Sequence, residues 1–497
     1  MWKYIGSVLI LIFLIGEAKT QDLEKDLLNA YRNAFQVSTG SARFNGLGGA
    51  MSAIGADLSM ISHNPAGIAA FWKSEVAGTL GISVMTNNSV LKDGGKGKVS
   101  SSDFQFNVPQ GGIVFTSYTP NKNWMSKSFG ITYNRQSSFG NEIFYEGNSL
   151  GSITERWAEL ADNFHPDDLK YDANLEAWPA WLAGAIYEVG DGDSYLYDYD
   201  YFSYEDKELF RSQLINNNGS IDELGISFGG NFRNTFLIGG SVGIDFMNFE
   251  SVKTYKESDT QGEVPEFEEL LFREFFSTTG IGINVKIGTI LKFTPEFSWS
   301  FSMASPTIMK LEDDFSTEIQ FDWSSNKEEP AIGSSDDFHF EYNFYNPWKI
   351  SSGIGYKFSN KGFIDAEVDY VGYKSLRYNF IDSDISTQSY QNDLNREITN
   401  QFNNALNIRL GGELTISSFR ARAGLFHYGS PFSKYKNTNG FSLGFGYRGD
   451  TWFIDVSYMN RGNSMHYQPY EFLRAVVPKV NIKTRDSNIG LTIGFKM

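Results

Sequence analysis

The sequence predicts an all-β protein: a 14-stranded antiparallel transmembrane β-barrel with an N-terminal hatch, or plug, inside its lumen. Three observations predict this class. Aromatic residues make up 16% of the 497 residues and there are 49 Gly but only 13 Pro, a composition rich in strand and turn formers. Apolar residues alternate with small or polar ones in many segments, and the connections between these segments alternate between short and long.

The chain begins with a secretory signal. Lys3 precedes an apolar run at 8–15, and small residues then lead to Ala18 and Thr20, after either of which cleavage is expected. Beyond this signal peptide, residues 1–20, no stretch approaches the ~18 consecutive apolar residues that a membrane helix requires. The exported chain is therefore expected to be either soluble or a β-barrel.

Strand periodicity favours the barrel. In 235–246 one face carries Phe236, Ile238, Val242 and other apolar residues, whereas the opposite face is mainly Gly, Ser, Thr and Asp; 451–459 behaves similarly. A soluble sandwich also alternates, but its inward face is bulky and interlocked. Small and charged residues opposite an aromatic-rich face instead indicate a lumen inside and lipid outside.

The predicted strands number fourteen, an even number as outer-membrane barrels prefer. They fall near 76–85, 108–118, 127–137, 221–230, 235–246, 275–293, 298–304, 341–358, 362–374, 403–414, 418–428, 438–448, 451–460 and 483–496. Short connections lie at 233–235, 294–296, 359–362 and 448–450, and long ones at 138–220, 305–340 and 375–402. The barrel is thus expected over 75–497, with its long loops facing outward.

Residues 21–74 do not alternate and precede the first strand. Residues 22–34 have a helical pattern, and two glycine- and alanine-rich stretches follow. An apolar, glycine-rich segment is costly to leave in water, so we expect it inside the barrel as a plug.

The plug sequence, AFQVSTGSARFNGLGGAMSAIGADLSMISHNPAGIAAF at 34–71, resembles the hatch of the FadL/TodX outer-membrane transporters. The family's Asn-Pro-Ala signature matches Asn64, Pro65 and Ala66, and its glycine-rich run matches Gly46, Gly48 and Gly49. The phrase FSWSFSMASP at 297–306 also resembles a strand of that family that ends before a long loop. The resemblance implies passive uptake of long-chain fatty acids or other hydrophobic compounds across the outer membrane of a Gram-negative bacterium.

In the hatch, Pro65 fixes its own φ and biases Asn64 away from helix, and neighbours such as Gly67 permit close backbone approach. This bend is expected to act as a gate, with the Asn64 side chain holding nearby backbone groups. The resemblance also implies that ligand lies near Ala34, Phe35 and Gln36 and exits laterally through a kinked strand, for which 127–145 is a candidate. The family's hatch begins almost at its N-terminus, whereas some residues precede Ala34 here, which argues against a terminal amine in the ligand site.

Charged residues are predicted to line the lumen. Asp365, Glu367 and Asp369 share one strand face, and Arg409, Arg420 and Arg422 point the same way from the following strands. Structural ion pairs are the simpler interpretation. The functional alternative is an arginine that binds a fatty-acid carboxylate.

Other patterns carry weaker signals. Asp191, Asp193, Asp198 and Asp200 fit no EF-hand spacing and are better explained as a solvated loop than as a calcium site. Residues 176–188 are expected either to catch ligand at the outer surface or to pack within their loop. His63 invites a haem interpretation, but packing within the hatch explains it more simply.

Composition excludes several functions. The chain has no Cys, which rules out disulfides and thiolate chemistry, and its net charge of -17 disfavours nucleic acid. No nucleophile motif or phosphate loop is present, so we expect no enzyme, no cofactor and no bound metal. The expected partners are a hydrophobic ligand and outer-membrane lipid, and the expected state is a monomer. The alternative function is a non-transport barrel for surface binding or secretion.

Overall fold

A computed structural model describes residues 23, 25–92, 94, 97–119, 122–162, 164–172, 175–189, 198–201, 207–323, 330–381, 385–470 and 477–497. The predicted signal peptide lies outside these residues, as do Asp191 and Asp193 of the predicted solvated loop. Within the described part of the chain, no helix has the length and apolar character needed to cross a membrane.

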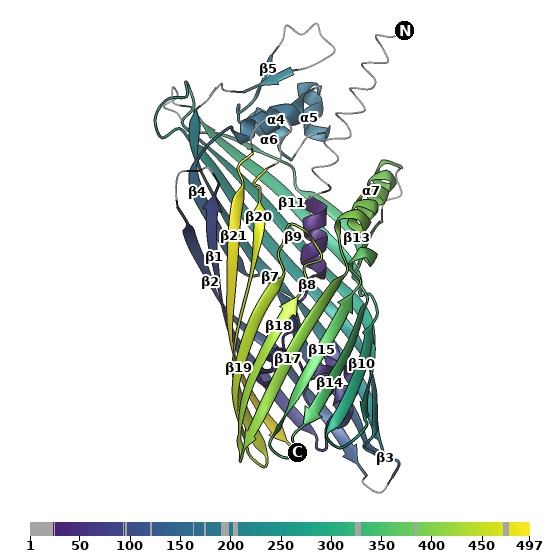
Figure 1. Cartoon of the computed structure of the whole chain (residues 1–497). Helices are drawn as coiled ribbons and strands as arrows, with labels where there is room; N and C mark the ends of the chain where they lie inside the picture. Colours follow the sequence, from purple (N-terminus) through teal and green to yellow (C-terminus); the bar gives the residue numbers. More distant parts are fainter. Residues whose placement is uncertain are drawn as a thin grey trace.

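The wall is a closed antiparallel barrel of 14 strands, as the sequence predicts (Figure 1). Several strands are interrupted, so the sheet contains 19 segments. Closure is made by the first and last strands, which pair from Glu75↔Lys496 to Leu91↔Val480.

In chain order the wall segments are β1 (Glu75–Leu91), β2 (Val99–Tyr118), β3 (Trp124–Ser138) with β4 (Asn141–Leu150), β7 (Glu208–Phe232), β8 (Phe236–Ser258), β9 (Glu269–Lys292), β10 (Phe297–Ala304) with β11 (Ile308–Asp322), β12 (Ala331–Ser334) with β13 (Phe338–Tyr345) and β14 (Lys349–Lys357), β15 (Gly362–Val371) with β16 (Arg377–Phe380), β17 (Ala405–Ile416), β18 (Phe419–Tyr428), β19 (Thr438–Arg448), β20 (Trp452–Tyr467) and β21 (Val480–Lys496).

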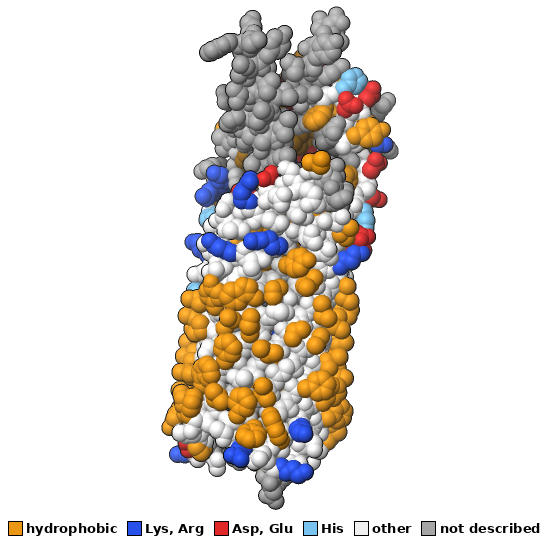
Figure 2. All heavy atoms as spheres, turned by 90° about the vertical axis from the view of Figure 1, so that its right-hand side faces the viewer, with side chains coloured by type: hydrophobic (Ala, Val, Ile, Leu, Met, Phe, Trp, Pro, Cys, Tyr) orange, Lys and Arg blue, Asp and Glu red, His pale blue; other side chains and the backbone are white. Residues whose placement is uncertain are grey.

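The outer face of the wall is apolar, as alternation predicts. Ile238, Val242 and Phe246 are 42%, 41% and 48% exposed, whereas their neighbours Leu237 and Asp245 are buried on the lumen side. On the face that Figure 2 shows, apolar side chains cover the lower part of the barrel in a broad band, with Lys and Arg above its upper edge and a few more at the bottom. This band is the surface that a lipid bilayer would cover.

One end of the barrel, here the turn end, carries the short connections. Between β7 and β8 the chain reverses through Arg233 and Asn234, both with positive φ, the geometry of a tight hairpin turn. The other end, here the loop end, carries α4 (Ile153–Ala161), α5 (Pro166–Asp172), α6 (Ala177–Leu182), β5 (Tyr187–Val189), β6 (Asp198–Asp200), η2 (Tyr373–Ser375) and α7 (Ile385–Gln401).

The predicted long connections are wrong in extent. The strands continue well into 138–220 and 305–340, as β4, β7, β11 and β12, and 375–402 contains β16 and α7. These segments extend the wall beyond the apolar band, where outward residues mix polar side chains such as Lys310 with apolar ones such as Ile332. The alternation that identified the membrane-embedded strands is therefore weaker there.

The N-terminal part of the chain lies inside the barrel (Figure 1). The hatch contains α2 (Ala42–Gly46), α3 (Met60–His63) and η1 (Pro65–Ala70). Residues 25–34 form a helix nearer the loop end, here the N-terminal helix. The lumen is therefore filled at two levels by segments that precede the first strand.

Candidate ligand site and gate

The hatch bend is held by the side chain of Asn64. Its Oδ1 accepts a hydrogen bond from the Ala66 amide at 3.1 Å and caps η1, which begins at Pro65. Its Nδ2 donates to the Ser52 carbonyl at 3.2 Å and to the Thr289 carbonyl on β9 at 3.4 Å. Asn64 thus joins two parts of the hatch to the wall, and its predicted role in holding backbone groups agrees with this geometry.

The wall opposite the hatch is built from glycine and serine because the hatch backbone approaches it closely. A Cβ on Gly239 would lie 2.3 Å from the Pro65 carbonyl oxygen, and one on Gly288 would lie 2.0 Å from Asn64 Oδ1. Ser298 and Ser302 donate to the carbonyls of Ala53 and His63. The small residues that alternate with apolar ones along the strands are therefore the seat of the hatch.

The glycine-rich run makes a similar contact. A Cβ on Gly46 would lie 3.0 Å from Gly444 Cα on β19. Gly48 and Gly49 have φ of 63° and 81°, a left-handed conformation that other residues rarely adopt, and Gly49 also lies beside Arg409 and Phe44. Gly67 packs on Met60 within the hatch, and Ala66 is fully buried.

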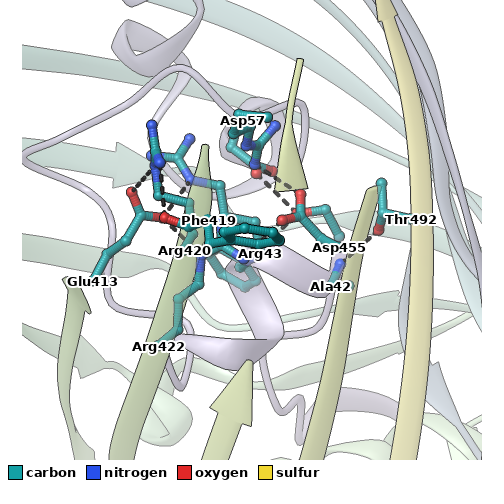
Figure 3. A network of polar contacts seen from close by, with 12 residues as sticks. Ala42, Arg43, Asp57, Glu413, Phe419, Arg420, Arg422, Asp455 and Thr492 are labelled. Carbon is teal, nitrogen blue, oxygen red and sulfur yellow. Dashed lines mark hydrogen bonds and ion pairs between the residues drawn. The ribbon is translucent and has the colours of Figure 1, made fainter. Parts of the chain in front are cut away.

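An ionic network joins the hatch to the wall near the turn end (Figure 3). Arg43 on α2 lies 3.4 Å from Glu413 and donates to the Ala56 carbonyl at 2.8 Å. Arg422 contacts both Glu413 and Asp455 at 2.7 Å, and Arg420 lies 3.8 Å from Glu413. Arg420 and Arg422, predicted as possible ligand contacts, are thus paired at this floor, which favours the structural ion-pair interpretation.

Arg409 is also paired. It is almost completely buried, with Glu367 at 2.6 Å and Asp369 at 2.7 Å, and it donates to Ser38 Oγ at 3.2 Å. Two carboxylates from the neighbouring strand therefore already satisfy this guanidinium. The third predicted carboxylate, Asp365, accepts from the Ala53 amide of the hatch.

The N-terminal helix occupies the lumen nearer the loop end. Leu27 and Ala30 are 1% and 0% exposed and belong to an apolar cluster with wall residues such as Leu311 and Phe344. Lys25 pairs with Glu176 at 3.1 Å, and Asp26 accepts hydrogen bonds from Tyr378 and Tyr390. The residues that precede Ala34 therefore form a helix, and this helix partly fills the lumen along the barrel axis.

The wall has a break between β2 and the third strand. β3 pairs with β2 only from Gln110↔Asn134 to Tyr118↔Ser126, and β4 pairs with β7 alone, so Val99–Pro109 has a strand partner on one side only. Pro109 lies where the pairing stops, and a proline cannot donate to a strand ladder. The interruption, Phe139–Gly140, falls within the predicted candidate 127–145.

Beyond the break, β4 bends inward. The Glu142 carbonyl accepts hydrogen bonds from Asn87 on β1 and from Ser101 on β2, at 2.6 and 2.7 Å. Ile143 and Tyr145 pack with Leu91, Val480 and Ile482 on the lumen side. The edge of β2 is therefore left facing a gap in the wall, here the lateral gap.

A cavity of about 320 Å³ lies beside this gap. Its lining includes Tyr31 and Arg32 of the N-terminal helix, Asn45 of the hatch, and the break residues 135–141. Phe35, a predicted ligand contact, also lines it, whereas Ala34 and Gln36 line a separate polar cavity of about 70 Å³. The larger cavity thus connects the hatch, the N-terminal helix and the lateral gap.

Arg32 brings a positive charge to this cavity. Its guanidinium lies 3.9 Å from the centroid of the Phe249 ring, and it donates to Asn29, Asn33 and Thr278. Among the residues that the structure describes, no ion pair within 4 Å involves it, and Asp313 is the carboxylate with the largest electrostatic influence on it. Its charge is therefore only partly balanced and can attract an anionic group in the cavity.

The gap is closed by a single side chain. A Cβ on Gly140 would lie 1.3 Å from Gln105 Nε2, so Gln105 of β2 rests directly against Gly140. Gln105 Oε1 accepts from Ser138 at 3.2 Å, and its Nε2 donates to Asp103 at 3.1 Å. Gln105 is therefore a flexible side chain that is held by two weak contacts at the lateral gap.

Sequence reasoning did not find Arg32, Gln105, Pro109 or Gly140. Two signals were present: a proline inside an otherwise regular strand, and the sequence SSFGN at 137–141, in which glycine interrupts alternation. No sequence feature identified Arg32 as a site residue, because an arginine in a helix that precedes the hatch is usually solvated.

The remaining predicted features have structural explanations. His63 stacks on Phe44 with ring centroids 4.7 Å apart. In 176–188, α6 buries Ala177 and Ala180 in an apolar loop cluster, and Trp178 stacks on Trp181, which favours packing within the loop. No group of three or more acidic, His or Cys residues suited to a metal occurs in the described part of the chain.

The architecture defined by these observations is a closed membrane barrel with an N-terminal plug and a break in its third strand. The "FadL homologue" of Pseudomonas aeruginosa has this fold: the two chains are 13% identical with a TM-score of 0.53, over 93% of this chain and 99% of that one. The Pseudomonas putida "toluene transporter TodX" is 12% identical with a TM-score of 0.52, over 92% and 99%.

No protein-family model and no curated protein matches the sequence. The chain therefore shares the fold of the FadL and TodX channels, as the resemblance of its hatch implied. At these identities the likeness concerns the fold.

Proposed function

We propose that the protein carries hydrophobic molecules with an anionic head, such as long-chain fatty acids, passively across the outer membrane of a Gram-negative bacterium. The observation that carries this proposal is the cavity above the hatch, whose walls mix apolar with polar side chains and which combines the Arg32 guanidinium with direct access to the lateral gap. The comparison structure described as a toluene transporter supports the hydrophobic part of this ligand class, whereas the anionic head rests on Arg32.

The route is lateral. The hatch blocks the lumen toward the turn end, so ligand in the cavity leaves through the lateral gap once Gln105 moves from Gly140. A fatty acid that takes this path passes from the cavity to the apolar outer face of β2, where Phe104 and Phe106 are exposed. Its chain then stays out of water throughout.

The hatch acts as the gate floor. Its bend at Asn64 and the ionic contact between Arg43 and Glu413 hold it against the wall. Movement of this segment changes the position of Asn45 and Phe35, which line the cavity, and so couples the seat of the hatch to the fit of the ligand.

The test distinguishes the contribution of the ligand's anionic head to binding from the contribution of its acyl chain. In the purified full-length protein, Arg32→Gln should weaken binding of hexadecanoate by about ten- to a hundredfold, because a charge-assisted hydrogen bond contributes about 1.5–3 kcal/mol. Binding of methyl hexadecanoate, which lacks the charge, should be unchanged. The matched control is Arg377→Gln, an exposed arginine that donates only to nearby carbonyls.

Equal loss for the acid and the ester would reject Arg32 as the anion contact. Failure of the wild-type protein to bind or transport either compound would reject the transport function altogether. The alternative, a non-transport barrel that binds at the surface or serves secretion, is favoured by one observation: the N-terminal helix packs tightly into the lumen.

A further inference from the structure

The loop end of the barrel carries a basic groove on its outer surface. It is lined by Lys436 and Asn439 beside β19, by Gly462 and Ser464 on β20, and by Lys483 on β21. Arg485 lies next to it, because its backbone pairs with Gly462. Lys436, Lys483 and Arg485 are all exposed.

Strand register sets the shape of this groove. Ser464 pairs with Lys483 on one side, and its carbonyl accepts from the Lys436 amide on the other at 2.9 Å. Adjacent strands are ~4.8 Å apart, so the two lysines stand ~10 Å apart with only Ser464 and Gly462 between them. The small residues form a floor that is flanked by positive charge.

In the described part of the chain, no carboxylate lies within the 4.0 Å ion-pair distance of Lys436, Lys483 or Arg485. Some other exposed basic residues are paired: Lys310 lies 2.7 Å from Glu341, and Arg273 lies 2.6 Å from Glu318. An unpaired basic cluster is notable in a chain whose net charge is -17.

The groove lies directly above the apolar band. On the same strands and the same face, Phe441, Tyr458 and Ile489 are exposed one or two pleats nearer the turn end. Figure 2 shows that Lys and Arg side chains gather at this level around the visible face as well. A molecule that fits both surfaces has an apolar body in the bilayer and an anionic head at its edge.

We propose that this groove binds the phosphorylated headgroup of a membrane lipid in the leaflet at the loop end of the barrel. The phosphate rests on Gly462 and Ser464 and is contacted by Lys436 and Lys483, while Arg485 offers paired donors from below. The acyl chains lie over Phe441 and Ile489. This site is on the outside of the wall, and Gly462 and Asn463 line both it and the cavity that contains Arg32.

The experiment is native mass spectrometry of the full-length protein in detergent, titrated with bisphosphorylated lipid A. The triple variant Lys436→Gln/Lys483→Gln/Arg485→Gln should bind at least tenfold more weakly than wild type, because each basic group near a lipid surface contributes several-fold to affinity. The control Lys310→Gln, which removes a charge already paired with Glu341, should bind as wild type does.

Two further arms keep the test decisive. The charge-preserving variant Lys436→Arg/Lys483→Arg/Arg485→Lys should retain binding, which separates loss of charge from a folding defect. A hundredfold excess of inorganic phosphate should not displace lipid A, because the acyl chains contribute much of the affinity. Equal binding by the triple variant and wild type, or displacement by free phosphate, would overturn the lipid site; fatty-acid transport is expected to be unchanged in either case.

Discussion

Gly67 offers the sharpest test of how the hatch is seated. A Cβ at this position would lie 2.7 Å from Met60 Cβ and 3.4 Å from Gly55 Cα, whereas carbon atoms in contact prefer about 3.5–4.0 Å. Met60 cannot turn away, because its Cβ is fixed to the backbone of α3. Gly67→Leu therefore requires the two hatch segments to separate by about 1 Å or more.

Such overpacking costs about 1–3 kcal/mol, and the cost falls on the hatch because the wall strands are unchanged. Separation also strains the hydrogen bond of 3.0 Å from the Ala56 amide to the Gly67 carbonyl. At about 1.4 kcal/mol for each factor of ten, the unseated population should rise roughly five- to a hundredfold.

The assay is the leakage of a small hydrophilic solute from proteoliposomes, together with protease cleavage within residues 40–70. Gly67→Leu should raise both, while the heat-modifiable mobility of the folded barrel stays normal. Gly78→Ala is the matched control, because nothing lies within 4 Å of the added Cβ on β1. If the two variants leak equally little and resist protease equally well, the packing argument is wrong.

Three further predictions concern the gate. Asn64→Ala removes the bonds to Ala66 and Ser52 and should destabilise the hatch by about 1–3 kcal/mol, measured by the urea concentration at which the hatch becomes protease-sensitive; an unchanged midpoint would refute its role. Deletion of 25–33 should open the axial path and increase solute entry, measured by liposome swelling, and an unaltered rate would show that this helix is no barrier. Burial alone would raise the pKa of Glu176, but Arg156 and Lys25 hold that pKa well below its ordinary value. Because the folded pKa is lowered, this contribution to stability is fully present above the unfolded pKa and is lost progressively as the pH falls from there toward the folded pKa. Proteolytic protection of residues 25–34 should therefore be equal at pH 8 and pH 6, decrease in stronger acid, and be reduced in Glu176→Gln at every pH above the unfolded pKa.

The strand pattern could be predicted because the lipid imposes it directly on the sequence. Residues such as Ile238 and Leu443 face the bilayer, and this requirement repeats every second residue along each strand. The bend at Asn64 was likewise predictable, since Pro65 restricts both residues wherever the segment lies.

The charged lumen could be predicted only in part. Alternation places Asp455 and Arg422 toward the lumen, but it does not say whether water or protein fills the lumen there. Both side chains are almost completely buried, and they pair across strands whose register the sequence does not specify. Arg409 and Arg422 therefore seemed equally available to a ligand, although carboxylates of neighbouring strands already bind both.

The lateral gap could be predicted only as far as the candidate strand 127–145, because its detail depends on contacts between segments distant in sequence. Pro109 ends the pairing of β2 with β3, and Gly140 gives Gln105 room to close the break. Pro109 and Gly140 are each a single residue within a strand pattern that continues on both sides, so neither one marks a gap by itself.

The central claim is that ligand leaves through the lateral gap, and a disulfide across it is the most direct test. The chain has no native Cys, so Gln105→Cys/Gly140→Cys introduces a single pair. A Cβ on residue 140 would lie 1.9 Å from the Gln105 Cδ, which places the two Cβ atoms at most about 4.5 Å apart, within disulfide range. Uptake of labelled hexadecanoate by this variant should stop when the disulfide forms and return when it is reduced, with each single-Cys variant unaffected. Uptake that continues at the same rate with the disulfide fully formed would contradict the lateral route.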